Sequence, residues 1–539
     1  MFEPFKKIKN LLQYLFVTLP FEFREKAFIR HNRRIWGPEC VKTPSGEVLV
    51  EVHPVASTVI AQSYMANFLA KKWDSSIIGY NTGHSNFLKK VYSFRIHRIY
   101  RSFNVDHFFY MDPSSYQQAL ANAKAREILN NLKTKKDVEG LKIYDLWIGD
   151  LLYDSYLMKY RVPTIDFADP NFFASLEEAL AYYFYWTDYL DTHKVRALVV
   201  SHCCYFENGL VVRLCIQRGI PVYQANAAYC HLLDQRHDRA YIEYLHYPEE
   251  FEKLSSKEQE EGIALAKQRL ELRFQGKPGV DMHYSTKSAY SAIKDERLLK
   301  NTDKLKILVA THCFFDSPHP FGNGIFPDFY EWLHFLGEVS KQTDYEWYIK
   351  THPDVLPGNV PILQEIVSQY PNFHFLPADS SHNQLIAEGV KVALTVYGTI
   401  GSEYAARGLL VLNAGLGNPH VAYPFNLHFD DIDSYKNALL QLNKLSISIE
   451  TARVYEYYFM HNLNQAHDWL FTDYKKFVAD LGSFNASITS KAYEYFLKGF
   501  SNERHGLILK TLSNFVDSKE YLLKKQHIQS AQHLANLSI

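Results

Sequence analysis

Stretches of alternating and continuous apolar residues recur along the chain, with helical patterns between them. Glu47 to Val52 and Ser75 to Tyr80 fit strands, and an amphipathic helix is predicted between them from Ser57 to Trp73. Further along, the predicted helix Leu176 to Thr192 leads to a strand at Val195 to Val200. Units of strand, helix and strand build parallel, doubly wound sheets. The first half of the chain is therefore predicted to be an α/β domain.

The second half repeats this pattern after a charged and polar stretch. Tyr241 to Tyr247 is predicted to be a strand, and Pro248 to Arg273 a charged helix. Gln275 to Thr302 is polar with few large apolar residues, which is typical of a linker. Another series of strands begins at Leu305 to Ala310. After Asp433 the chain is predicted to be helical and to pack back on the first domain.

The predicted fold class is α/β, with two Rossmann-like doubly wound domains facing a cleft and extra helices at both termini. A chain of 539 residues is long for one core and suits two such domains. The predicted division is 1–45, a basic amphipathic helical segment; 46–275, the first Rossmann-like domain; 276–303, a linker; 304–435, the second Rossmann-like domain; and 436–539, a helical region.

A polar motif ends one predicted strand of the second half. It is YEWYIKTHP, which closes on Lys350, His352 and Pro353. In a parallel sheet the ligand crevice lies outside the carboxyl ends of the strands. Lys350 supplies a compact positive charge and His352 an N–H donor, and both suit a phosphate oxygen. The alternative is a simple turn at Pro353 with Lys350 in solvent.

A second motif lies some fifty residues later, in VALTVYGTIGSEYAARGLLVLNAG. Its glycines would let the backbone approach a ligand, and its hydroxyls would lie where a helix begins. Glu403, in the first helical turn, would accept hydrogen bonds from sugar or ribose hydroxyls. Helix capping and dipole compensation are the alternative. The glycines and hydroxyls meant here are Gly398, Thr399, Gly401 and Ser402.

Together the motifs resemble bacterial surface-polysaccharide glycosyltransferases of the GT-B type. The likeness is to the capsule-synthesis group that includes the Kdo transferases, in which a KxHP segment precedes a Gly-Ser/Thr-rich loop and a Glu-bearing helix. In that group the His-Pro pair and the later loop contact the phosphate of a CMP-linked sugar. The resemblance implies a nucleotide-sugar domain at 304–435 and an acceptor domain at 46–275. The implied donor-binding residues are Lys350, His352, Pro353, Gly398, Thr399, Gly401, Ser402 and Glu403.

Polar groups also mark the first half. YDLWIGDLLYDSYLMKY places Asp150 and Asp154 on one helix face, and the capsule group carries a similar segment. The turn SHCCYFENG, after the strand ending at Val200, adds His202, Glu207 and Asn208. Its echo in THCFFDSPH suggests two equivalent turns facing each other across the cleft. Asp154, His202 and Asn208 are the expected acceptor contacts.

A catalytic base would activate the acceptor hydroxyl in such a transfer. Glu207, Asp150 and Asp316 are the candidates, since each would face the cleft from a loop or a helix end. The sequence does not separate them. A retaining mechanism would need no such base, and the family includes retaining members.

Charge and composition narrow the function classes. The formal net charge of −1 argues against a nucleic-acid partner, because proteins that bind nucleic acids usually carry an excess of basic residues. The six cysteines form no CxxC pair and are expected to be reduced thiols. No DxD motif follows an apolar strand, so we expect no essential metal and no cofactor. The nucleotide sugar is then a substrate.

The N-terminal stretch Phe5 to Phe21 (FKKIKNLLQYLFVTLPF) combines lysines with a short apolar run. Gln13 interrupts that run and no small-residue cleavage site follows, so a basic amphipathic helix is predicted rather than a signal peptide. We expect a cytoplasmic protein. Two placements stay open for the helix: the inner face of the cytoplasmic membrane, near a lipid-linked acceptor, or the protein's own body.

The sequence thus predicts a glycosyltransferase that moves a sugar from a nucleotide-activated donor, CMP-linked donors being favoured, to a bacterial surface oligosaccharide or lipid-linked glycan. The alternatives are a teichoic-acid type CDP-polyol phosphotransferase, a sugar-nucleotide epimerase on the same fold, and a non-catalytic GT-B subunit. The donor sugar, the acceptor and the linkage stay open.

Overall fold

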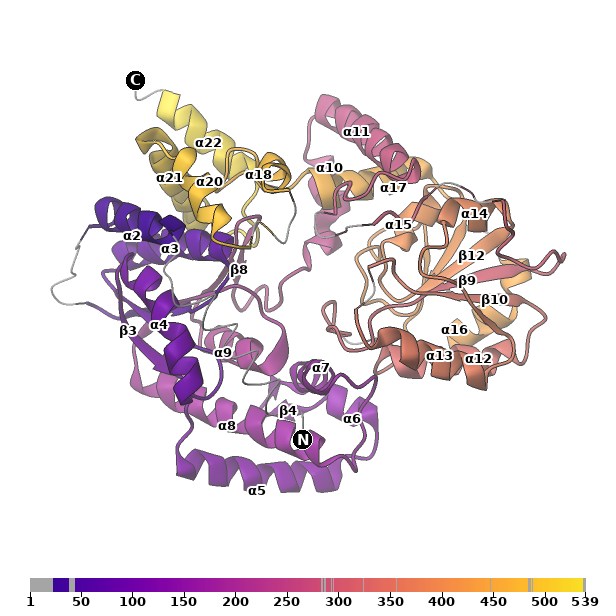
Figure 1. The fold of residues 1–539 in the computed structure, drawn as a ribbon, viewed down its shortest axis with the longest axis horizontal. Coiled ribbons are helices and arrows are strands. Elements are labelled where there is room, and N and C mark those ends of the chain that lie inside the picture. Colours follow the sequence, from indigo (N-terminus) through magenta and orange to yellow (C-terminus); the bar gives the residue numbers. More distant parts are fainter. Residues whose placement is uncertain are drawn as a thin grey trace.

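The computed structural model of the chain contains two parallel sheets, each with its own helices (Figure 1). The structure describes residues 23–37, 44–282, 285, 287–291, 293, 295–322, 324–354, 356–445, 447–482, 486 and 488–536, with the backbone alone for 87–89, 91–92 and 534–536. The predicted helix at 5–21 lies outside these residues. No described helix has both the length and the apolar character of a membrane span.

The first sheet has the strand order β3-β2-β1-β6-β7-β8. Leu49 in β1 pairs with Ile78 on one side and Leu198 on the other, and only β8 runs antiparallel to its neighbour. The strands are β1 Glu47–Glu51, β2 Ser76–Asn81, β3 Val105–Tyr110, β6 Val195–Val200, β7 Val222–Ala225 and β8 Cys230–Leu233. The helices are α3 Ala56–Lys72, α4 Phe87–Arg101, α5 Ser115–Asn131, α6 Lys135–Glu139, α7 Gly149–Tyr160, α8 Pro170–Thr192 and α9 Tyr205–Gln217.

The second sheet repeats this order as β11-β10-β9-β12-β13-β14, with every pair parallel. Leu308 in β9 pairs with both Tyr348 and Ala393, so β9 is central. The strands are β9 Lys306–Ala310, β10 Glu346–Lys350, β11 Phe373–Phe375, β12 Val390–Thr395, β13 Leu410–Asn413 and β14 Leu427–His428. The helices are α12 Phe329–Ser340, α13 Asn359–Gln369, α14 His382–Ala387, α15 Ile400–Ala405 and α16 Ile432–Leu440.

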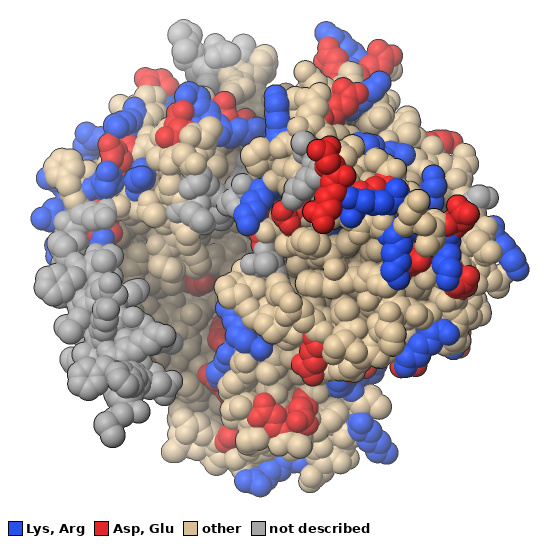
Figure 2. Space-filling model, turned by 45° about the vertical axis from the view of Figure 1, so that its right-hand side comes forward, with Lys and Arg blue, Asp and Glu red and all other residues tan. Residues whose placement is uncertain are grey.

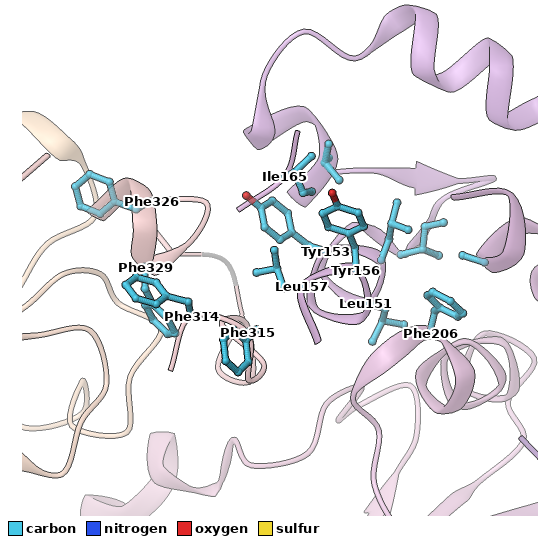
Figure 3. Packing of buried hydrophobic residues seen from close by; sticks show 14 of the residues in the cluster. Leu151, Tyr153, Tyr156, Leu157, Ile165, Phe206, Phe314, Phe315, Phe326 and Phe329 are labelled. Atoms are coloured by element: carbon cyan, nitrogen blue, oxygen red, sulfur yellow. The ribbon is translucent and has the colours of Figure 1, made fainter. Parts of the chain in front are cut away.

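Both sheets therefore have the doubly wound Rossmann order. The two domains meet along α7, whose side chains face the segment between β9 and α12 (Figure 3). The hydroxyls of Tyr153 and Thr164 both donate to Asp328 Oδ2, at 2.5 and 2.6 Å. Away from this contact the surface is hollowed between the domains (Figure 2). The predicted fold, two doubly wound domains facing a cleft with extra helices at both termini, is confirmed.

The C-terminal helices return to the first domain, as predicted. Phe28 in α2 stacks on Tyr493 at 4.4 Å, and the Tyr64 hydroxyl in α3 lies 3.1 Å from His505 Nδ1. The helices outside the two sheets are α2 Phe23–Ile35, α10 Tyr247–Glu252, α11 Ser256–Phe274, α17 Thr451–Tyr458, α18 Tyr474–Asp480, α20 Lys491–Lys498, α21 Asn502–Ser518 and α22 Lys525–Asn536.

Two expectations are corrected by the structure. The predicted strand at 241–247 is instead a 3-10 helix, Glu243–His246, that runs into α10. Tyr244 and Tyr247, three residues apart, are both buried in one cluster, which is a helical rather than an alternating spacing. The turns after β6 and β9 are not equivalent either, because β9 has the sheet position of β1. They do meet, through the Tyr205 hydroxyl and Asp316 Oδ1 at 3.2 Å.

Candidate functional site

A cavity of about 710 Å³ opens at the carboxyl ends of β9, β10 and β12. This is the switch point of the second sheet, where the strand order reverses and ligands of doubly wound folds bind. All the lining residues lie between Arg273 and His461. Among the predicted site residues the lining includes Asp316, Lys350, His352, Pro353, Gly398, Thr399 and Glu403.

Lys350 is a buried ammonium at the end of β10. Its side chain is in the cavity lining although the residue is only 3% exposed, and Nζ donates to the Thr351 carbonyl at 3.2 Å. No carboxylate oxygen of the described residues lies within 4.0 Å of Nζ, and the carboxylates of Asp379 and Glu403 act on it only from a greater distance. Burial lowers the pKa of Lys350 to about 8. The ammonium has three N–H donors, so it can still bind an anion that enters the cavity.

His352 offers a second donor because of its own hydrogen bond. Its Nδ1 accepts the backbone N–H of Asp354 at 3.0 Å. Burial lowers the pKa of His352, which favours the neutral ring. A neutral ring that accepts at Nδ1 carries its proton on Nε2. His352, which lines the cavity, therefore has an Nε2–H that can donate a hydrogen bond.

His312, after β9, offers a third donor by the opposite tautomer. Its Nε2 accepts the Val396 backbone N–H at 3.2 Å and lies 3.1 Å from Thr395 Oγ1. Burial lowers the pKa of His312 to about 3, so the ring is neutral and Nδ1 carries the proton. His312 belongs to the THCFFDSPH segment, in which the sequence singled out Asp316 instead. Its place at the end of the central strand was the available signal.

Glu403 is already engaged by protein groups. The Arg273 guanidinium donates to Oε1, and the Tyr290 hydroxyl donates to Oε2 at 2.8 Å. Burial would raise the pKa of Glu403, but Arg273 and Tyr290 together hold it below its ordinary value. The ionised carboxylate thus fixes Arg273 and Tyr290 in the cavity wall.

The remaining residues of the second motif divide between the cavity and the packing behind it. Gly398 and Thr399 line the cavity, whereas Ser402 Oγ donates to the Thr399 carbonyl at 3.1 Å. A Cβ atom at Gly401 would lie 2.5 Å from the His420 ring. Gly401 is therefore required by packing against His420, and Ser402 bonds within its own turn.

Two of the acidic candidates from the first domain form buried ion pairs. Asp150 accepts two hydrogen bonds from Arg213, at 2.7 and 2.5 Å, and the guanidinium lies 4.6 Å above the Trp147 ring. Asp154 Oδ1 lies 2.5 Å from His319 Nδ1. Burial lowers the pKa of His319, but Asp154 and Glu139 outweigh it and raise that pKa to about 9. Neither aspartate is in the cavity lining.

The turn after β6 also lies outside the cavity lining. Glu207 is half-buried in the first turn of α9. Asn208 Nδ2 lies 3.4 Å from His202 Nε2. Within the described part of the chain, Asn208 Oδ1 and His202 Nδ1 are buried without a hydrogen-bond partner. The structure thus brings Asp316 and the donor motifs together, and places the first domain's candidates elsewhere.

Two further residues of the cavity wall were missed. His382 lines the cavity and its Nδ1 lies 2.8 Å from the Tyr404 hydroxyl; Arg273 comes from the end of α11. Neither follows a strand, so no local pattern marks them. In the described residues no group of three His, Cys, Asp or Glu side chains is arranged to hold a metal ion.

No protein-family model and no curated protein matches the chain in sequence. Among solved structures it is similar to the Thermosulfurimonas dismutans KpsC β-Kdo 2,4 transferase, at 11% identity and a TM-score of 0.29, over 49% of this chain and 79% of the other. The Neisseria meningitidis UDP-GlcNAc 2-epimerase matches at 12% identity and 0.22, over 80% and 98%. Acinetobacter baumannii MurG matches at 11% and 0.24, over 78% and 95%. TM-scores this low assign no family, so the chemistry is argued from the cavity.

Proposed function

We propose that the protein is a glycosyltransferase that binds a nucleotide-activated sugar in the cavity of the second domain. The observation that carries this proposal is Lys350, a buried ammonium with no carboxylate of the described residues within 4.0 Å, in a cavity of about 710 Å³. A buried charge of this kind is costly unless an anion pairs with it. A volume in this range suits a ligand of nucleotide size.

The three donors define the leaving group that we propose. Lys350 supplies a positive charge, and the neutral rings of His352 and His312 supply N–H groups at the same strand ends. Such donors stabilise a phosphate as it departs with increasing negative charge. The KxHP resemblance favours a CMP-linked sugar, and no metal is then needed at the phosphate. EDTA treatment should leave the transfer rate unchanged.

Asp316 is the acid that we propose as the catalytic base. It is exposed, lines the cavity and lies at the contact with Tyr205 of the first domain. Asp150 is held in its pair with Arg213. The partnerless atoms of His202 and Asn208 support a role for these two residues in binding an oligosaccharide or lipid-linked acceptor.

An assay with purified protein tests the proposal. CMP-, CDP-, UDP- and GDP-linked donors would each be incubated with and without a lipid-linked or oligosaccharide acceptor. We expect nucleotide release only when acceptor is present. Product formed from the donor alone would indicate an epimerase, and transfer of a polyol phosphate from a CDP-linked donor would indicate the teichoic-acid type reaction.

Substitution of His352 tests the site itself. His352→Ala should weaken binding of the preferred nucleotide about tenfold, the loss expected for one hydrogen bond to a charged group. His193→Ala, at an exposed position after α8, is the matched control and should change nothing. Equal nucleotide affinity in the two variants would contradict the assignment.

A further inference from the structure

Two adjacent helices on the outside of the first domain expose mainly basic residues, and we name their outer sides the α2–α4 face. The helices pack against each other, and Arg95 of α4 donates to both carboxylate oxygens of Glu25 in α2, each at 2.6 Å. Glu25 is the only acidic residue of the two described helices and is 6% exposed. The ion pair therefore joins the helices and leaves no carboxylate of theirs on the outside.

The outward side of this face carries cations at helical spacing. All are exposed. Those of α2 are separated by three or four residues and the two of α4 by eleven, about three helical turns, so the cations of each helix lie on one of its sides. They are Lys26, Arg30, Arg33 and Arg34 in α2, and Lys90 and Arg101 in α4. Because the whole chain has a formal net charge of −1, this basic excess is local.

Two phenylalanines lie among these cations. Phe23 is 79% exposed and Phe94 is 58% exposed. Phe23 precedes Lys26 by three residues, and Phe94 follows Lys90 by four, so each aromatic ring shares its helix side with the cations. A single exposed apolar side chain is ordinary. Aromatic rings placed among cations match a bilayer surface, where anionic headgroups lie above an apolar layer.

We propose that the α2–α4 face docks on a bilayer that contains anionic lipid, with Phe23 and Phe94 entering the headgroup region. Figure 1 places α2 and α4 on the side of the first domain away from the second sheet, so docking leaves the nucleotide cavity open. The proposal rests on surface charge and exposure alone. It holds or fails independently of sugar transfer.

Vesicle co-sedimentation of the full chain tests the proposal. The probes are vesicles of phosphatidylcholine alone and of phosphatidylcholine mixed with phosphatidylglycerol. Arg30→Glu combined with Lys90→Glu should weaken binding to the mixed vesicles roughly thirty-fold or more, because each basic residue near an anionic surface contributes about fivefold. Lys267→Glu combined with Lys444→Glu changes the net charge equally at exposed positions outside the face, and should bind as the unchanged protein does.

Phe94→Ser separates the apolar contribution from the electrostatic one. Its loss of binding should be smaller and should persist at high salt, whereas the effect of Arg30→Glu with Lys90→Glu should disappear as salt screens the charges. Several results would overturn the proposal: no binding of the unchanged protein to mixed vesicles, equal binding to neutral vesicles, or equal losses in the two charge-reversed variants. Binding to RNA or an acidic glycan that is tighter than vesicle binding and insensitive to Phe94→Ser would identify a soluble polyanion as the ligand instead.

Discussion

The two domains share one strand order but treat their strand ends differently. In the first domain, Glu51 at the end of β1 accepts the backbone N–H and the hydroxyl of Ser201, at 2.6 and 2.7 Å. In the second domain, Lys350 donates to a neighbouring backbone carbonyl and lines a cavity. At the first switch point the Glu51 carboxylate is occupied by Ser201, and at the second one Lys350 keeps N–H donors available in the cavity.

This contrast shows that the strand order determines where a ligand site can lie, but that the side chains there determine whether a ligand is bound. The available donors make it. Lys350 Nζ donates to a backbone carbonyl, and the rings of His352 and His312 accept from backbone N–H groups, which leaves further N–H donors on all three side chains. In the first domain the buried cation Arg213 of α9 is instead neutralised by the carboxylate of Asp150. Substitutions in the two domains should therefore have opposite kinds of effect.

The largest expected effect is on the stability of the first domain. Arg213→Ala would leave Asp150 buried and without its ion pair, so the free energy of unfolding should fall by about 3–5 kcal/mol. Nucleotide affinity of the folded protein should not change. Urea denaturation and calorimetric titration would measure the two quantities. Arg218→Ala, which breaks the more exposed pair with Asp191, should cost about 1 kcal/mol or less. Equal losses in both variants would remove the contrast between the domains.

In the second domain the effect should fall on binding rather than on stability. Lys350→Met should weaken nucleotide binding by about ten- to a hundredfold, since it deletes hydrogen bonds to a charged phosphate. The fold should be at least as stable, because a buried charge is replaced by an apolar chain of similar length. Lys341→Met, at an exposed position directly after α12, is the control. A destabilised Lys350→Met variant with normal affinity would make Lys350 a structural residue.

The smallest expected effect is on the pH dependence of nucleotide binding. An anion binds the charged form of Lys350, whose pKa is about 8, so affinity should be level below pH 8 and fall about tenfold per unit above it. The nucleotide phosphate is fully ionised throughout, with a second pKa of about 6. Calorimetric titration at pH 7 to about 9.5 would show this, and Lys350→Met should show no fall.

Fold stability should respond to pH in the opposite direction at Lys350. The lysine has a pKa of 10.5 when unfolded, so the unfolded chain binds more protons between about pH 8 and 10.5 and stability rises across that window. At the domain contact, His319 behaves conversely. Its stabilising contribution is complete below its ordinary pKa of 6.5 and is lost as pH rises through about 9. Measuring the free energy of unfolding against pH in His319→Gln and in Lys350→Met would separate the contribution of each residue to the pH dependence of stability.

Sequence reasoning predicted the features that depend on local order. The strands that end at Lys350 and Thr395 were found, and with them the position of His352 and Gly398 at the switch point. These follow from the alternation of side chains and from the rule that parallel strands end at one edge. Both the alternation and the polar residues at the strand end lie within one short segment, so they can be recognised in a single sequence.

The partners of the charged candidates could not be predicted in this way. Glu403 is paired with Arg273, 130 positions earlier in the chain, and Asp154 with His319, 165 positions later. The sequence does not show which cation pairs with a given acidic side chain, because the two residues can lie far apart in the chain and meet only in the folded protein. The same distance in sequence explains why Arg273 was missed as part of the cavity.

The return of the C-terminal helices to α2 and α3 determines when each core can be completed. The outer side of α3 is covered by α20 and α21, which are made more than four hundred residues later. The second domain has all its strands by residue 428. During synthesis on the ribosome, the first domain is therefore begun first and completed last. Its apolar helix α3 stays uncovered until α20 and α21 are made, when the second sheet is already complete.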